Sequence, residues 1–461
     1  MIKRRKKLTG RKSSAIISRT MLQELALKEA VRNNEKSKGP HTSPNPEHYP
    51  NGYLWDSNFA AIVYAELGEP DRGAQEVETV LSWQNKKSGF IPNMKLGYGR
   101  NLDIEKYTFT NPGHESNYSQ PPFHARAAMT VYKSYVESGQ KTKGERFLKD
   151  NYESLALAYK YFIDGRQNSE SDPLIGIIHP HETGRDSDPT FDFIKKRLPT
   201  MPGKTPKVIS LANTVFDYGS ALKLNVDLMK VNWNIKRIRE EGIFWVNDVM
   251  FNVAYAENLR YMSEIAEIVG NKGGVEFFGQ KADDVAQKII GEMWDEKNQM
   301  FYATDIDGAP IKKISISNIT PIMLPGIKNE QLSRILDLLD NKDWFNTPYP
   351  IPSVPAKSPN FDPHYDEKRL WRGPVWMNTN WMIVEALFMQ AEKPGVKGTK
   401  LAERCMNRAF EICEKSIELA KEHGFWEFYD AINGQGLRIN HFTWSTLAGV
   451  IEKRYLEKKT A

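Results

Sequence analysis

Apolar residues recur at intervals of three and four along most of the chain, which is the spacing of one face of an α-helix. The clearest run is 247–269. Its repeating apolar positions are Val249, Val253, Ala256, Leu259, Met262 and Ala266. Alternating patterns typical of strands are scarce, so the sequence predicts an all-α protein.

Similar runs predict further helices, which together with 247–269 make about twelve helices or six hairpins. They lie near 57–67, 70–85, 120–138, 143–165, 206–230, 273–294, 317–325, 328–340, 374–391, 397–423 and 441–458. No fixed period of about 34 or 40 residues appears, which argues against an open solenoid of repeats. The alternative is a closed ring of helical hairpins.

Long irregular joins alternate with short ones between these helices. The long joins are 86–119, 166–205, 295–316, 341–373 and 424–440. Loops longer than about 15 residues are usually functional or disordered. In a closed ring, long loops gathered on one face would build a site, while short turns would close the other face.

A Pro-rich connector at 35–52 precedes the first aromatic motif. No composition break divides the chain after it. We therefore expect residues 1–50 to hold a basic tail, a first helix and the connector, and residues 51–461 to form a single catalytic domain.

The charge of the chain is uneven. The formal net charge of +5 arises from 63 Lys and Arg against 58 Asp and Glu, and seven of these cations stand in the first twelve residues. Without those seven, 56 basic residues face the 58 acidic ones. The body is therefore not basic, and no nucleic acid partner is expected.

The lack of a recognisable targeting signal and the spacing of the two cysteines predict a cytoplasmic location. No apolar run approaches the ~18 residues that a membrane span needs, and no apolar segment of a secretory signal follows the charged start. Cys405 and Cys413 lie eight residues apart in a predicted helix, roughly 12 Å along its axis. That separation exceeds the ~7 Å reach of a disulfide, so two free thiols in a reducing compartment are expected.

Two carboxylates stand among aromatic and polar residues in segments between helices. HETGRDSDP at 181–189 carries Asp186, and FWEFYD at 425–430 carries Glu427. Enzymes that cleave glycosidic bonds need two carboxylic acids brought together by folding, one that gives a proton and one that takes a proton.

Tryptophan is concentrated near other polar residues, in YLWDS at 53–57 and in LWRGPVW at 370–376. A pyranose ring is apolar on its faces and hydroxylated at its rim, so aromatic rings beside Asp and Arg suit it. The two carboxylates and the tryptophans together predict an enzyme that acts on sugars.

The chain resembles glycoside hydrolase family 63 and its trehalase-like relatives, among them the short bacterial mannosylglycerate and glucosylglycerate hydrolases. The resemblance spans residues ~20–455. The matching stretches are YLWDSNFAA (53–61), GFIPNM (89–94), SQPPFHA (119–125), ETGRDSDP (182–189), RLWRGPVWMNTNW (369–381) and FWEFYDAINGQG…HFTWS (425–445). It implies a six-hairpin (α/α)6 barrel and hydrolysis of small α-glucosides or α-mannosides with inversion.

The resemblance also implies roles for particular residues, with Asp186 as general acid and Glu427 as general base. The residues expected to contact substrate are Tyr53, Trp55, Asp56, Gln120, Trp371, Arg372, Gly373, Trp376, Tyr429 and Trp444. Three positions depart from the family pattern: Thr183 replaces Ser, Asp188 replaces a small polar residue, and Asn93 stands where many relatives have His. A second carboxylate at 188 would raise the pKa of Asp186.

Simpler interpretations remain for several positions. Asp56 suits a helix N-cap, and Gln120 suits a capping amide. Asp188 and Asp192 are rival candidates for the acid. His179 and His181 resemble a metal pair but lack a nearby third ligand, so neither a metal nor a cofactor is expected.

Two other functions stay open. A sugar isomerase or epimerase on the same barrel would use a histidine to abstract a proton from carbon, and His441 or His179 would serve. A non-catalytic helical scaffold would leave Asp186 and Glu427 far apart. The expected partner is a small carbohydrate or sugar-glycerate, without nucleic acid or membrane, and a homo-oligomer remains open.

Overall fold

The computed structural model of the chain describes residues 19–95, 116–197, 218–364 and 370–460, and most of these are helical. The α-helices are α1 (Met21–Lys36), α2 (Leu54–Glu66), α3 (Pro70–Ser82), α5 (His124–Glu137), α6 (Lys141–Gly165), α8 (Tyr218–Lys230), α9 (Ile235–Glu240), α10 (Val249–Val269), α11 (Lys272–Glu292), α12 (Asn329–Leu339), α13 (Met377–Glu392), α14 (Lys400–His423) and α15 (Leu447–Thr460). The 3-10 helices are η1 (Pro180–Thr183), η2 (Pro189–Arg197), η3 (Ile316–Met323) and η4 (Thr443–Thr446).

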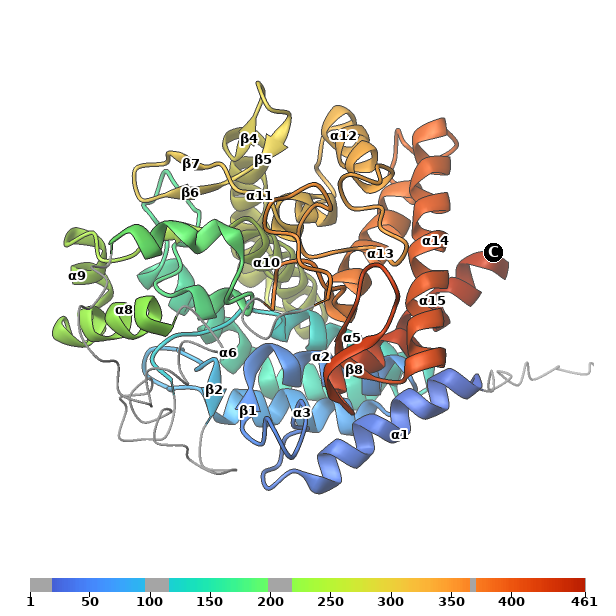
Figure 1. The fold of residues 1–461 in the computed structure, drawn as a ribbon. Coiled ribbons are helices and arrows are strands. Elements are labelled where there is room, and N and C mark those ends of the chain that lie inside the picture. Colours follow the sequence, from blue (N-terminus) through green and yellow to red (C-terminus); the bar gives the residue numbers. More distant parts are fainter. Residues whose placement is uncertain (1–18, 96–115, 198–217, 365–369, 461) are drawn as a thin grey trace, which may run out of the picture.

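Helices pack in pairs around a closed ring (Figure 1). The pairs are α1 with α15, α2 with α3, α5 with α6, α10 with α11, η3 with α12, and α13 with α14. One member of each pair contacts its counterpart in the next pair, in the order α2, α5, α10, η3, α13 and α15, and α15 contacts α2 again. The predicted (α/α)6 barrel is therefore confirmed.

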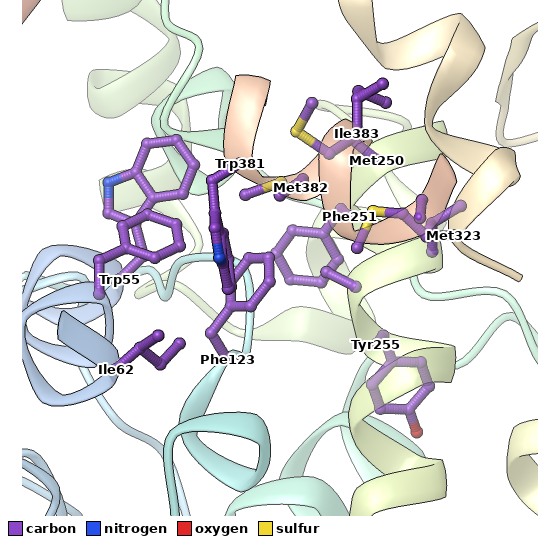
Figure 2. Packing of buried hydrophobic residues seen from close by; sticks show 14 of the residues in the cluster. Trp55, Ile62, Phe123, Met250, Phe251, Tyr255, Met323, Trp381, Met382 and Ile383 are labelled. Atoms are coloured by element: carbon purple, nitrogen blue, oxygen red, sulfur yellow. The ribbon is translucent and has the colours of Figure 1, made fainter. Parts of the chain in front are cut away.

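The inner ring holds the apolar core. Figure 2 shows side chains from different inner elements directed into one cluster, and all of them are buried. They include Ile62 of α2, Phe123 just before α5, Phe251 of α10, Met323 of η3 and Trp381 of α13. The helix α2 is buried along nearly its whole length, as expected for a helix with neighbours on every side.

Most predicted helices are confirmed, with ends displaced by a few residues. The run at 317–325 is wrong in type, because η3 is a 3-10 helix that contains Pro321, which removes a backbone donor. The run at 374–391 begins later than predicted: α13 starts at Met377, and Pro374 precedes it. Of the run at 206–230, residues 218–230 form α8, and 206–217 lie outside the described residues.

Membership of the ring differs from the prediction in one respect. The helix α8 is not part of the six pairs, and α1 takes the place expected for it by packing on α15. A capping box between Thr20 and Gln23 begins α1. The helix α1 packs on α15 and α2 of the barrel. The division of the chain at residue 50 stays a prediction.

Short antiparallel strands lie in or beside the joins between helices. They pair as β1 (Gly52–Tyr53) with β2 (Met94–Lys95), β3 (Val246–Asn247) with β6 (Ala303–Asp305), β6 with β7 (Pro310–Ile311), β4 (Trp294–Asp295) with β5 (Met300–Phe301), and β8 (Trp426–Tyr429) with β9 (Gly436–Asn440). Across the described ranges, no helix is both long and apolar enough to pass through a lipid bilayer.

Candidate active site

A cavity of about 160 Å³ opens at the N-terminal ends of α2 and α13. An apolar cavity of about 150 Å³ holds one benzene molecule, so the size suits a single six-membered ring. The lining residues are Pro44, Tyr49, Tyr53, Trp55, Asp56, Asn93, Met94, Tyr118, Gln120, His181, Gly184, Asp186, Leu370, Trp371, Trp376, Glu427, Phe442 and Trp444.

Four of the five long joins contribute to this cavity. In chain order they supply Asn93, Met94 and Tyr118 from 86–119, His181, Gly184 and Asp186 from 166–205, Leu370 and Trp371 from 341–373, and Glu427 from 424–440. The long loops therefore do gather at one end of the ring, apart from 295–316, none of whose residues lines the cavity.

Glu427 lies on β8 and is only 3% exposed. Its Oε1 accepts hydrogen bonds from the Tyr49 hydroxyl at 3.1 Å and from Nη1 of Arg438 at 2.6 Å. Its Oε2 is buried and accepts no hydrogen bond from the described residues. Burial raises the pKa of Glu427 to about 7, although Arg438 and Tyr49 lower it and the charge of Asp186 raises it.

Asp186 lies in the loop after η1 and lines the same cavity. Burial raises the pKa of its carboxyl, and the neighbouring side chains of His181, Arg438 and Arg185 partly offset this effect. The charge of Asp186 raises the pKa of Glu427, and both carboxyls line one cavity. The sequence expectation that folding unites them is met.

Buried ion pairs fix the loop that carries Asp186. Arg166, at the end of α6, binds both carboxylate oxygens of Glu182, and neither side chain is exposed. The same carboxylate accepts the backbone N–H groups of Ser119 at 3.0 Å and Ile178 at 2.7 Å. This network anchors the chain four residues before Asp186.

Arg185 connects the same loop to the inner helix α10. Its Nη2 donates at 2.6 Å to Asp248, whose other oxygen caps α10 by accepting the N–H of Phe251 at 2.8 Å. Its Nε donates at 3.1 Å to Asp188. The residue next to the candidate acid is thus held by two buried carboxylates.

The rival acids are both engaged with arginines and lie outside the cavity lining. Asp188 is 1% exposed and accepts from Arg185 and from the N–H of Thr190 at 2.9 Å. Asp192 forms a two-bond pair with Arg372. The expected rise in the pKa of Asp186 is confirmed in direction, but burial rather than Asp188 is its main cause.

Tryptophans form an aromatic wall of the cavity. Trp371 and Trp376 stack with ring centroids 3.8 Å apart and planes at 3°. Trp444 stands edge-on to Trp376 at 5.4 Å and to Trp55 at 5.7 Å. All four line the cavity, as expected from the sequence.

Asp56 is not the N-cap of α2, so that simpler interpretation is wrong. The N-cap is Tyr53, and Asp56 lies inside the first turn. Asp56 lines the cavity at 5% exposure, and burial raises the pKa of its carboxyl well above the usual range, with the charge of Glu427 adding to the rise. Its role in substrate binding stays a prediction.

Gln120 lies in the cavity lining and also makes a capping contact, while its role in substrate binding stays a prediction. It lines the cavity, and its Oε1 accepts the N–H of Trp55 at 3.2 Å. That N–H is one of the free donors at the start of α2. Gln120 thus caps α2 from a neighbouring segment while facing the cavity beside Tyr53.

Three residues expected to contact substrate lie outside the cavity lining. Arg372 is held by Asp192 and by Asn360 at 2.7 Å. Tyr429 is fully buried, and its hydroxyl donates to the carbonyl of Gly424 at 2.6 Å. Their roles in binding stay predictions, and the contacts show that both support the loops around the cavity.

Gly373, the third of them, permits a close approach of two backbone segments. Its φ is +151°, and a Cβ at this position would stand 2.4 Å from the carbonyl oxygen of Asp362. Its N–H donates to Ser353 at 2.9 Å. The glycine thereby sets the path of the chain between Trp371 and the start of α13.

The histidine alternatives find no support in the described residues. His179 is fully buried and stacks on Tyr118 at 4.7 Å. His441 is half-exposed and pairs with Glu29 of α1, away from the cavity. No group of three potential metal ligands occurs in the described ranges.

Sequence reasoning missed several residues of the cavity. Tyr49 in the Pro-rich connector binds Glu427, and Tyr118 accepts or donates a hydrogen bond with His181 at 3.0 Å. Pro44, Met94, Leu370 and Phe442 complete the lining. The aromatic residues within loops were a usable signal, but their contacts depend on the fold.

Comparison with known proteins agrees with this geometry. The family model for the mannosylglycerate hydrolase MGH1-like glycoside hydrolase domain matches residues 49–445. A curated mannosylglycerate hydrolase from Rubrobacter radiotolerans is 26% identical over 434 residues, which cover 88% of this chain and 91% of that relative. Another from Thermus thermophilus is 24% identical over 89% of this chain and 95% of its own length.

Solved structures support the fold. A GH63 mannosylglycerate hydrolase from Thermus thermophilus, solved in complex with Tris and D-glycerate, superposes with a TM-score of 0.77 at 22% identity. The match covers 94% of this chain and 100% of the other. The helical ring of this chain is therefore an arrangement found in an experimental structure.

Proposed function

The chain belongs to the mannosylglycerate hydrolase MGH1-like glycoside hydrolase family, and we propose that it hydrolyses a small α-glycoside with inversion, using Asp186 as general acid and Glu427 as general base. The observation that carries this assignment is the pair of carboxyls in one cavity with different bonding. Oε2 of Glu427 is buried and accepts no hydrogen bond from the described residues, so it is available to bind a water.

In the proposed reaction, Asp186 gives its proton to the glycosidic oxygen as the bond from that oxygen to the anomeric carbon breaks. Glu427 removes a proton from a water that attacks the same carbon on the opposite face of the ring. Room for that water requires the two carboxyl groups to stand roughly 6.5–9.5 Å apart.

The environments of the two groups suit these roles. The raised pKa of Asp186 favours the protonated form that an acid needs. Arg438 donates to Oε1 of Glu427 and opposes the effect of burial, which raises the pKa of Glu427 to about 7, so the ionised form that a base needs predominates above about pH 7. The two carboxyls differ in their contacts. Arg438 binds Glu427 directly, whereas Asp186 lies in a loop that the ion pairs of Glu182 and Arg185 hold in place.

The proposed substrate is an α-mannoside or α-glucoside of small size, such as a sugar-glycerate. The names of the relatives support this class. Trp55, Trp371, Trp376 and Trp444 offer aromatic surface to one sugar ring. Tyr53, Asp56 and Gln120 offer polar groups, and Arg372, Gly373 and Tyr429 are proposed to act with them at the rim.

We also propose a cytoplasmic location, in keeping with the two thiols. Cys405 and Cys413 are buried and free in the structure. A homo-oligomer stays a prediction.

The test of the proposed function is a hydrolysis panel with glucosylglycerate, mannosylglycerate, trehalose, kojibiose and nigerose. Asp186→Asn and Glu427→Gln should each lower turnover by roughly 10²–10⁴-fold on the substrate that the wild-type enzyme cleaves. Glu418→Gln is a matched control, because Glu418 also binds a tyrosine hydroxyl and a cation, Tyr349 and Lys415, outside the cavity.

The control should turn over substrate at the wild-type rate. Hydrolysis of none of the five glycosides by the wild-type protein would contradict the substrate class. Undiminished turnover by Glu427→Gln would remove that residue as base, and undiminished turnover by Asp186→Asn with an inactive but folded Asp188→Asn would move the acid to position 188.

A further inference from the structure

The hairpin that carries Glu427 contains an irregularity opposite that residue. Trp426 of β8 pairs with Asn440 of β9, and Phe428 pairs with Leu437. One residue of β8 therefore faces two of β9, which is the count of a β-bulge. Bulges next to active sites often redirect a side chain.

Arg438 occupies the bulge in a left-handed backbone conformation, with φ +68°. For a residue other than glycine this conformation costs roughly 1–2 kcal/mol, and such strain tends to occur at functional sites. The bulge and the left-handed backbone bring the guanidinium onto Glu427, with Nη1 at 2.6 Å from Oε1. Strain that places one cation on one carboxylate points to a function for the contact.

Tyr49 completes a triangle with these two residues. Its hydroxyl donates to Oε1 of Glu427 at 3.1 Å and accepts from Nη1 of Arg438. The guanidinium also lies over the Tyr49 ring at 5.4 Å from its centroid. The three groups come from the Pro-rich connector and both strands of the hairpin, so each fixes the orientation of the other two.

The triangle uses only one of the two carboxylate oxygens. Both donors converge on Oε1 of Glu427, and Oε2 stays buried without a hydrogen bond from the described residues. A carboxylate held by two donors on one oxygen cannot rotate without breaking both bonds. The second oxygen is therefore kept available for a ligand or a water in the cavity.

We propose that Arg438 and Tyr49 are positioning residues that hold Glu427 ionised and oriented, with Oε2 directed at the attacking water. This inference rests on the proposed role of Glu427 as general base. Arg438 supplies the charge that stabilises the carboxylate, and Tyr49 supplies a neutral bond that fixes its orientation.

The pH dependence of kcat/KM reports on this arrangement, because several charged groups surround Glu427. Arg438 lies on β9, Tyr49 on the connector, Asp186 on the loop after η1 and Asp56 on α2. Arg438 lowers the pKa of both Glu427 and Asp186, whereas Tyr49 bonds to Glu427. The acidic limb of the profile reports the ionisation of Glu427 and is called the Glu427 limb. Removing either partner should therefore move this limb to higher pH.

The experiment compares Arg438→Gly, Arg438→Lys and Tyr49→Phe with His441→Gly. Glycine adopts a positive φ without strain, so Arg438→Gly removes the side chain while the bulge keeps its shape. His441→Gly is the matched control: His441 has φ +60° in the same segment, and its side chain pairs with Glu29 outside the cavity. If Arg438→Gly fails to fold, Tyr49→Phe carries the test.

We expect Arg438→Gly to lower kcat roughly 10²-fold with little change in KM, as for a misplaced catalytic group. Both limbs of its pH profile should move upward, the Glu427 limb by more. Arg438→Lys should return that limb toward the wild-type position. Tyr49→Phe should move the Glu427 limb alone, and His441→Gly should match the wild-type enzyme.

Three results would overturn the inference. The first is a pH profile that is unshifted in both Arg438→Gly and Tyr49→Phe. The second is a rise in KM with unchanged kcat in Arg438→Gly. The third is a pH profile of Arg438→Lys equal to that of Arg438→Gly. If the wild-type protein hydrolyses none of the glycosides tested, the proposed function fails separately. A double-mutant cycle of unfolding free energy between Arg438→Gly and Glu427→Gln at pH 8 then decides, and the absence of coupling overturns the contact.

Discussion

Gly184 packs so closely on Trp55 that a Cβ at position 184 would stand 2.3 Å from Cζ2 of the indole ring. The backbone of Gly184 has φ +67°, which other residues adopt only with strain. Gly184 lies two residues before Asp186, and Trp55 precedes Asp56 on α2. This contact therefore sets the distance between the loop of the proposed acid and the inner helix beside it.

Gly184→Ala should displace the Asp186 loop. We expect kcat to fall by roughly 10²-fold and the free energy of unfolding to fall by roughly 2–4 kcal/mol, from the left-handed backbone and the clash together. The control is Gly270→Ala, because Gly270 has φ +82° at the end of α10 with open space around it.

Gly270→Ala should lower the free energy of unfolding by only about 1–2 kcal/mol and leave kcat unchanged. Kinetic assays and urea unfolding of the two variants provide the comparison. Equal losses of activity in both would show that the contact with Trp55 has no part in placing Asp186.

The buried pair of Arg166 and Glu182 should be the main anchor of the same loop. Glu182→Ala removes the partner of a fully buried guanidinium and the acceptor of two backbone N–H groups. We expect the free energy of unfolding to fall by roughly 3–5 kcal/mol, measured by urea unfolding.

Glu241→Ala is its control, since Glu241 pairs with Arg237 on an exposed surface, where the two side chains are 46% and 50% exposed. Its effect should stay within roughly 0.5 kcal/mol. A loss in Glu182→Ala no larger than in the control would contradict the anchoring role.

The barrel was predictable from sequence because the spacing of apolar residues shows which segments bury one face. The spacing does not show which neighbour covers that face. For this reason the sequence placed the run at 206–230 in the ring and the first helix outside it, whereas the contact of α1 with α15 shows that α1 belongs to the ring. Pro321 likewise sits within an apolar run, but its missing N–H favours a 3-10 helix.

In the site, the sequence predicted the residues whose chemistry is visible in their own segment. Asp186 and Glu427 stand among aromatic residues, and both line the cavity. Tyr49 was missed because its contact with Glu427 joins positions 378 residues apart. Arg372 was expected to face a sugar, yet its position beside tryptophan gave no sign of Asp192 as partner.

The pH dependence of kcat/KM should be bell-shaped. Burial raises the pKa of Glu427 to about 7 and raises that of Asp186 from its ordinary value. The active form needs Glu427 ionised and Asp186 protonated, so activity declines when acid protonates the base and when alkali ionises the acid. One limb should therefore have its midpoint near pH 7, and a profile that is flat between about pH 5 and 9 would rule out this pair.

Stability should also depend on pH through Glu76. This carboxyl on α3 is 1% exposed and accepts from Thr42 and Asn34 but contacts no cation in the described residues. Burial raises its pKa to about 8. The folded state therefore binds the proton of Glu76 more tightly than the unfolded state does. The stability gained from this proton is complete below about pH 4.5 and is lost as pH rises to about 8.

Glutamine at position 76 has no proton to lose in this range. The free energy of unfolding of Glu76→Gln should therefore fall less between pH 5 and pH 8 than that of the wild-type protein. We expect a difference of roughly 2–5 kcal/mol from the wild-type slope, measured by urea unfolding across that range. Glu78→Gln, at an exposed position of the same helix, should keep the wild-type slope. An unchanged slope in Glu76→Gln would show that Glu76 ionises normally in the folded protein.

The configuration of the released sugar tests the central claim most directly. Proton NMR of the wild-type reaction on the α-glycoside that it cleaves, recorded before the anomers equilibrate, identifies the first product. Attack by a water held on Oε2 of Glu427, on the face opposite the leaving group, predicts the β-anomer. An initial α-anomer would require retention of configuration and would contradict the role of Glu427 as general base.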